Sequence, residues 1–223
     1  MSKKVFLSPS NQYDNVYAYG NTTEGVKCGK IADACKIALE RSGVDVMLMH
    51  DESMQTKCAE SNKFGADLHV PIHTNAFNGS VMGTRMFCYN TGKGMAACKA
   101  IFSRVAPLSP GTSENIQVNQ KLYEVRVPAA PTAYLECEFH DTVEGAKWIV
   151  ENTTAIGEAI AHGICDYFGV TFKEPEQPKP AKPVTTGTLY RVQVGAFAVR
   201  ENAEKMLARL KAAGFEGFIR EGK

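Results

Sequence analysis

The sequence predicts an α/β fold: a mixed, mostly parallel sheet with helices on both faces, followed by a short β-α-β half-domain. Short apolar runs alternate with segments of helical periodicity over residues 5–168. The composition is that of an ordinary globular protein, with 44% hydrophobic and 22% charged residues. Strands that alternate with helices of this length form largely parallel sheets that are covered on both faces.

The first elements follow from short local signals. Residues 5–7 are an apolar run before a Ser-Pro turn and predict a strand. Residues 24–42 carry apolar side chains at helical spacing and stop at a glycine, so we expect a helix. A second strand is expected at 44–49, and a helix at 54–64 that again ends at a glycine. Residues 67–72 predict the third strand.

The later elements repeat the alternation. Strands are expected at 82–89 and 133–139, and helices at 94–105 and 143–168. Gly157 lies inside the last helix and argues against one straight helix.

A proline-rich segment divides the chain. Residues 174–187 hold four prolines within nine residues, which neither a helix nor a strand tolerates. We therefore expect a first domain at 1–173, a semi-extended linker at 174–187 and a second part at 188–223. The second part predicts strand 189–197, helix 201–213 and strand 215–220, which is too small to form a stable core alone.

Charge and cysteine usage exclude several classes of protein. Lys and Arg total 25 against 24 for Asp and Glu, so the charge balance does not favour a nucleic-acid partner. The seven cysteines are scattered without a C-x-x-C pair, and we interpret them as small buried residues made in a reducing cytoplasm. The N-terminus lacks an apolar core of signal-peptide length, and no stretch is long enough to span a membrane.

Polar residues collect where the predicted strands end. His73 closes the third strand, Glu24 begins the first helix, and Glu136 and Glu138 flank a cysteine in the last strand. A histidine and carboxylates from different strand ends can form a zinc site that leaves one position for water. Taken singly, Glu24 also suits a helix start and His73 a buried hydrogen-bonded histidine. Residues 136 and 138 are harder to explain without a partner, because buried carboxylates need one.

Three segments resemble one enzyme family. Residues 66–75 read A-D-L-H-V-P-I-H-T-N, and residues 122–126 and 131–136 read L-Y-E-V-R and P-T-A-Y-L-E. Glu24 lies thirteen residues after Asn11. Together with this spacing, the three segments resemble the zinc-dependent N-acetylmuramoyl-L-alanine amidases called amidase type 3, over residues ~4–170. The resemblance implies a Zn²⁺ cofactor, with Glu24 and His73 as ligands and Glu136 as the catalytic carboxylate. Glu138 stays the alternative catalytic carboxylate.

One position departs from that family. Its usual third ligand is a histidine in a D-P-G-H-G turn, where this chain reads S-P-S-N-Q with Asn11 in the histidine position. Asn11 or Gln12 could bind the metal weakly, His140 could replace the histidine, or the metal could be lost. His69 is a poor replacement, because it lies four positions from His73, ~13 Å along the strand. The S-P-S-N-Q turn resembles clostridial and phage amidase-like sequences.

The C-terminal part is similar to another family. Residues 190–197, Y-R-V-Q-V-G-A-F, and the helical segment after them resemble the first half of a SPOR domain, a module that binds glycan strands. The similarity implies a peptidoglycan partner, and two copies could complete one fold as a dimer. We therefore expect an enzyme that cleaves the amide between N-acetylmuramic acid and L-alanine, made in the cytoplasm without a signal peptide and acting at the cell wall. The alternatives are a metal-free wall-binding protein and a metallopeptidase.

Overall fold

The structure is a computed structural model that describes residues 2–112, 115–175, 193–212 and 214–221. Its contacts divide the chain into two compact units, Met1–Pro175 and Glu176–Lys223, which are described separately.

The first unit is built on a six-stranded sheet with the order β2-β1-β3-β6-β4-β5. All neighbours pair in parallel except β4 and β6, which are antiparallel. The predicted mixed, mostly parallel sheet is therefore confirmed. The strands are β1 (Lys4–Pro9), β2 (Asp45–Leu48), β3 (Leu68–Asn75), β4 (Arg85–Cys88), β5 (Asn115–Val118) and β6 (Tyr134–Phe139).

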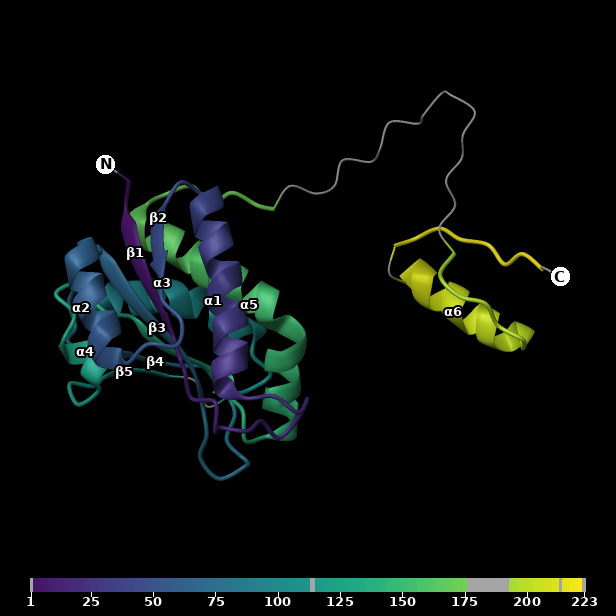
Figure 1. The fold of residues 1–223 in the computed structure, drawn as a ribbon, viewed down its shortest axis with the longest axis horizontal. Helices are drawn as coiled ribbons and strands as arrows, with labels where there is room; N and C mark the ends of the chain where they lie inside the picture. Colours follow the sequence, from purple (N-terminus) through teal and green to yellow (C-terminus); the bar gives the residue numbers. More distant parts are fainter. Residues whose placement is uncertain (1, 113–114, 176–192, 213, 222–223) are drawn as a thin grey trace. The chain divides into compact units, whose positions relative to one another are not determined.

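Helices cover both faces of this sheet (Figure 1). On one face, α1 (Glu24–Arg41) and α3 (Lys93–Val105) pack against the long helix α5 (Val143–Phe168). On the other face lie α2 (Met54–Phe64) and the short helix α4 (Tyr123–Arg126). The sequence did not predict α4, β5 or the 3₁₀ turn at Ala106–Leu108, because segments of three or four residues are too short to show a periodicity.

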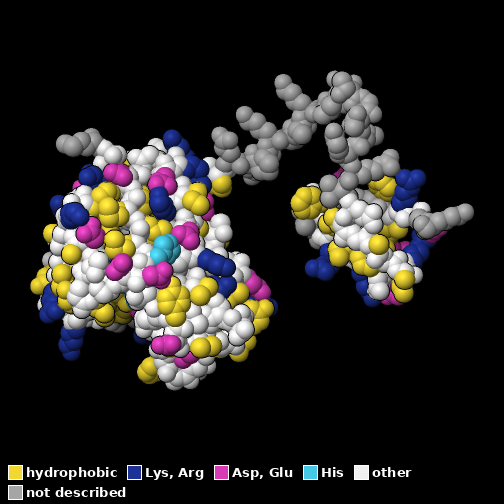
Figure 2. All heavy atoms as spheres, in the orientation of Figure 1, with side chains coloured by type: hydrophobic (Ala, Val, Ile, Leu, Met, Phe, Trp, Pro, Cys, Tyr) yellow, Lys and Arg dark blue, Asp and Glu magenta, His cyan; other side chains and the backbone are white. Residues whose placement is uncertain are grey.

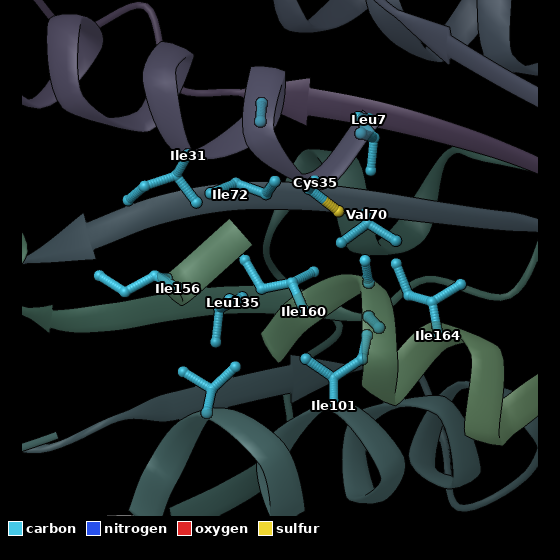
Figure 3. Packing of buried hydrophobic residues seen from close by; sticks show 14 of the residues in the cluster. Leu7, Ile31, Cys35, Val70, Ile72, Ile101, Leu135, Ile156, Ile160 and Ile164 are labelled. Atoms are coloured by element: carbon cyan, nitrogen blue, oxygen red, sulfur yellow. The ribbon is translucent and has the colours of Figure 1, made fainter. Parts of the chain in front are cut away.

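The main core lies between the sheet and the helices α1, α3 and α5. Figure 3 shows Leu7, Val70, Ile72 and Leu135 of the sheet facing isoleucines of these helices. Each fully buried side chain of this size stabilises the fold by about 1.5–3 kcal/mol relative to exposure. All seven cysteines are free and buried, as expected from their scattered positions.

The helix α5 bends, but not at the glycine. Its non-helical residue is Asn152, with φ −124° and ψ 19°. Gly157 instead allows α5 and α1 to approach closely, because a Cβ there would lie 2.6 Å from the carbonyl oxygen of Ile31. The sequence therefore predicted an irregular helix correctly but attributed the irregularity to the wrong residue.

In the second unit, the structure describes one helix, α6 (Arg200–Ala212). The predicted strands at 189–197 and 215–220 are wrong over the described residues 193–197 and 215–220, which form no strand. A strand needs a neighbour for its backbone N–H and C=O groups. Among the described residues 193–212 and 214–221, the backbone hydrogen bonds close only helix turns. Residues 189–192 and most of the expected linker lie outside the described residues.

Two further features concern the surface charge and the apolar character of the helices. In Figure 2, acidic and basic side chains are interspersed over the visible face of the first unit, without a large basic area. Within the part of the chain that the structure describes, no helix combines the length and the apolar character that crossing a membrane requires.

Candidate metal centre

The candidate site lies at the carboxyl ends of three adjacent parallel strands. β1 runs into the Ser10–Gln12 turn, β3 ends with His73–Asn75, and β6 carries Glu136 directly beside His73. Parallel strands end at the same edge of the sheet, where ligand sites of α/β folds collect. Glu24 reaches this edge because α1 begins there, directly after the loop that follows β1.

His73 and Glu24 form the centre of the site. The Nδ1 atom of His73 lies 2.9 Å from Oε1 of Glu24. The side-chain amide nitrogen Nε2 of Gln12 lies 3.4 Å from each of these two atoms. Asn15 donates a hydrogen bond of 2.7 Å to the other oxygen of Glu24. The sequence prediction that His73 and Glu24 meet is therefore consistent with the fold, and Gln12 joins them.

The surroundings of the two central groups favour the ionised carboxylate of Glu24 and the protonated ring of His73. Burial acts to raise the pKa of Glu24, but the bond with His73 and the amide of Asn15 keep that pKa below its ordinary value. Burial acts to lower the pKa of His73, but Glu24 and the charges of Glu136 and Glu124 keep it above its ordinary value. The site thus concentrates negative charge around one imidazole, which suits a cation.

Glu136 differs from the other carboxylates. Its Oε2 atom is buried and has no hydrogen-bond partner among the described residues. Burial raises the pKa of Glu136 to about 7, with the charge of Glu24 adding to the effect and that of His73 opposing it. A carboxyl group with a pKa near neutrality can accept and return a proton at neutral pH.

Glu138, two residues further, lies in a different environment. Its carboxylate accepts hydrogen bonds from the backbone N–H groups of Gly83 (2.6 Å) and Phe139 (2.7 Å) and from the hydroxyl of Ser109. These bonds satisfy both oxygens and tie β6 to the segments before β4 and after α3. The contacts assign Glu138 a structural role and leave Glu136 as the carboxylate that faces the site.

The remaining predicted residues lie at the margin of the site. The side-chain amide of Asn11 donates to the backbone oxygen of Glu52 at 3.0 Å. His140 is buried, with its Nδ1 atom 3.0 Å from the hydroxyl of Thr74 and its ring stacked on Tyr17. In the turn after β1, it is therefore Gln12, and not Asn11, whose side-chain amide lies beside His73 and Glu24.

Two further residues contact the site without having been singled out from the sequence. The ring of Tyr134 stacks on His73 with centroids 4.7 Å apart. Glu124, on α4, lies with Oε2 4.0 Å from the Nε2 atom of His73. Both fall inside the segments that carried the family resemblance, but only the pairing of β3 with β6 and the position of α4 bring them to His73.

The donor set fits a zinc ion. An imidazole nitrogen and a carboxylate oxygen converge from different elements, as in catalytic zinc sites with an open position. The buried Oε2 atom of Glu136, which has no hydrogen-bond partner among the described residues, is a further acceptor beside them. A second group, Cys58, His69 and Glu124, also has donor atoms within 4.8 Å of one another.

The chain is similar to known proteins over most of its length. Residues 13–166 match the N-acetylmuramoyl-L-alanine amidase family, and residues 173–221 match the SPOR domain. The sporulation-specific N-acetylmuramoyl-L-alanine amidase of Bacillus subtilis is 25% identical over 97% of this chain and 84% of its own length.

Solved structures share the fold. The catalytic domain of the amidase CwlV from Bacillus (Paenibacillus) polymyxa has a TM-score of 0.68 at 16% identity, over 76% of this chain and 99% of that domain. An N-acetylmuramoyl-L-alanine amidase from Clostridium difficile has a TM-score of 0.64 at 20% identity, over 75% and 97%. Because the family match covers more than half of the sequence, the chain belongs to the N-acetylmuramoyl-L-alanine amidase family of cell-wall hydrolases.

Proposed function

We propose that this enzyme hydrolyses the amide between N-acetylmuramic acid and L-alanine with a zinc ion held by Glu24 and His73. The observation that carries the proposal is the convergence of three groups at one strand edge: His73, the Glu24 carboxylate 2.9 Å from its ring, and Glu136 beside it on β6. The match to the amidase family supports the substrate. When bound at such a site, zinc polarises a carbonyl group and makes water more acidic.

Glu136 is the proposed proton carrier. Its pKa of about 7 makes both protonation states available at neutral pH. As the carboxylate it accepts a proton from the attacking water, and as the acid it returns that proton to the leaving amine nitrogen. Glu24 cannot take this role, because the bond with His73 keeps its pKa low and its carboxylate ionised.

The third protein ligand is proposed to be Gln12. Its amide lies 3.4 Å from both central atoms, and a rotation of that amide would direct its oxygen to the same point. Asn11 and His140 are the alternatives from the sequence, but the side chain of Asn11 bonds to the Glu52 carbonyl and the ring of His140 to Thr74. An amide oxygen is a weaker zinc ligand than imidazole, so we expect weaker zinc binding than at a site with two histidines.

The test is the release of amino groups from purified cell walls by metal-loaded protein and by chelator-treated protein. We expect activity to require zinc. The Glu136→Gln variant should lose the activity but still bind zinc. Glu138→Gln is the matched control and should keep the metal centre. Equal activity of the Glu136→Gln variant and the wild type would overturn the role of this carboxylate.

The same preparation separates the alternatives. A metal-free wall-binding protein would contain no stoichiometric zinc in elemental analysis and would bind walls without changing them. A metallopeptidase would release fragments cut within the stem peptide, which mass spectrometry distinguishes from glycan strands with free lactyl groups. We expect one zinc per chain and cleavage at the lactyl–alanine amide.

The C-terminal unit is proposed to hold the enzyme on peptidoglycan glycan strands, at the cell wall. Its match to the SPOR domain supports this function. The described part exposes several large apolar side chains, among them Val194 (56% exposed), Phe215 (63%) and Phe218 (79%). A second copy could cover them and complete the fold as a dimer. Sedimentation of the full chain with and without residues 176–223 tests the dimer, and wall pull-down of the same pair tests glycan binding.

A further inference from the structure

A buried polar cluster lies on the far side of His73 from Glu24. Its centre is Glu124, which is 8% exposed and comes from the short helix α4. Oε1 of Glu124 accepts a hydrogen bond from the hydroxyl of Ser8, at the end of β1, and lies 3.3 Å from Nε2 of His69. The Nδ1 atom of His69 lies 3.0 Å from the hydroxyl of Ser61 on α2. These contacts link the side chains of Ser61, His69, Glu124 and Ser8 in one series.

These bonds determine where the second oxygen of Glu124 lies. With Oε1 held by Ser8 and His69, Oε2 is directed at the site and lies 4.0 Å from Nε2 of His73. The two nitrogens of His73 thus face two different carboxylates, Nδ1 that of Glu24 and Nε2 that of Glu124. The stacked ring of Tyr134 covers one face of the imidazole.

We propose that Glu124 is a positioning residue for the metal centre, which keeps the proton of His73 on Nε2 and leaves the lone pair of Nδ1 free for the metal. A neutral imidazole binds a metal through one nitrogen, and the partner of the other nitrogen decides which one that is. The separation of 4.0 Å is longer than a direct hydrogen bond, so the contact acts as a charge attraction or through a bridging water. This inference rests on the proposed zinc function of Glu24 and His73.

The cluster has a competing interpretation. Donor atoms of Cys58, His69 and Glu124 lie within 4.8 Å of one another, so they could hold a metal of their own. The contacts favour positioning, because both ring nitrogens of His69 already have partners, Ser61 and Glu124. Burial also raises the pKa of the Cys58 thiol to about 12, which disfavours the thiolate that zinc requires.

The experiment is zinc affinity, measured on the full chain by competition with a chromogenic chelator, together with zinc stoichiometry. We expect Glu124→Gln to weaken zinc binding by roughly 10–100-fold, the effect typical of outer partners of ligand histidines. Cys58→Ala is the matched control, since it touches the same cluster without facing His73, and should leave affinity and stoichiometry unchanged.

The outcomes separate the hypotheses. If His73→Ala weakens zinc binding but Glu124→Gln does not, the positioning role is overturned and the proposed function stands. If His73→Ala binds zinc like the wild type, the proposed zinc site itself fails. A second zinc that disappears in Cys58→Ala would overturn the positioning role in favour of a separate metal site.

A spectroscopic measurement on the wild type covers the case in which Glu124→Gln does not fold. In ¹⁵N NMR spectra of the zinc-loaded protein, we expect His73 to carry its proton on Nε2 and to bind the metal through Nδ1. The opposite arrangement, with the metal on Nε2, would overturn the inference, because Glu124 would then face the metal and not a proton.

Discussion

Replacing Glu136 by glutamine removes the one carboxyl group of the site whose pKa is raised. The variant keeps the size of the side chain but cannot ionise. Burial and the charge of Glu24 raise the pKa of Glu136 from 4.5 to about 7 against the opposing charge of His73. A carboxyl group with a higher pKa in the folded chain binds more protons when folded, so the free energy of unfolding decreases as pH rises from about 4.5 to about 7.

The magnitude follows from the difference in pKa. Each pKa unit corresponds to 1.36 kcal/mol, so a rise from 4.5 to about 7 corresponds to about 3 kcal/mol of destabilisation above pH 7. Without metal, the wild type carries this cost at pH 8 and the Glu136→Gln variant does not. One kcal/mol changes the melting temperature by roughly 2–4 °C for a domain of this size. We therefore expect the variant to melt roughly 6–12 °C higher at pH 8.

Thermal unfolding of chelator-treated protein, followed by circular dichroism between pH 4.5 and pH 8.5, measures this difference. The two melting temperatures should lie close together at pH 4.5, where the carboxyl group is protonated in the folded chain and about half protonated in the unfolded chain. Glu138→Gln is the control and should be less stable, because it loses a charge that Gly83, Phe139 and Ser109 bond. Curves for Glu136→Gln and wild type that stay parallel over the whole range would refute the reasoning.

Three further predictions concern the metal, the helix packing and a helix cap. Adding zinc at 100 times its dissociation constant should stabilise the wild type by about 2.7 kcal/mol, whereas His73→Ala should gain much less in the same thermal shift assay. Gly157→Val should cost about 1–3 kcal/mol in urea unfolding, because any Cβ there meets the carbonyl of Ile31 at 2.6 Å; an unchanged midpoint would contradict this. Ser53→Ala should cost about 1 kcal/mol in the same assay, because the Ser53 hydroxyl accepts from the N–H of Thr56, and Ser53→Asp should keep the stability.

Much of the fold followed from local chemistry. The helix at Met54–Phe64 was predicted to the residue from the glycine that ends it. In the structure Ser53 caps its first turn, and Gly65 adopts the left-handed conformation at its end. The strand at β3 was predicted too short, at 67–72, although it continues through Asn75. The reason is physical: polar residues such as His73 and Thr74 interrupt the apolar pattern, while the backbone continues to pair with β6. Polar residues of the candidate site therefore broke the apolar pattern from which the strand was predicted.

In the C-terminal unit, the sequence predicted strands that the described residues do not form. The alternating residues of the segment around Val194 predicted a strand, but a strand exists only where a neighbour bonds its backbone. The helix α6 closes its own hydrogen bonds and was predicted correctly, apart from its ends. Local sequence thus predicts a helix more reliably than a strand whose partner lies elsewhere.

The sequence alone predicted the α/β class, the family and three groups of the candidate site, because apolar periodicity and a short motif are local properties of the chain. The tertiary structure decided which side chains contact one another there and what environment each one has. It directs Gln12, and not its neighbour Asn11, at His73, separates the environments of Glu136 and Glu138, and brings Glu124 to the far side of the ring. Side-chain direction and burial depend on packing between distant segments, and the spacing of residues along a chain does not contain that information.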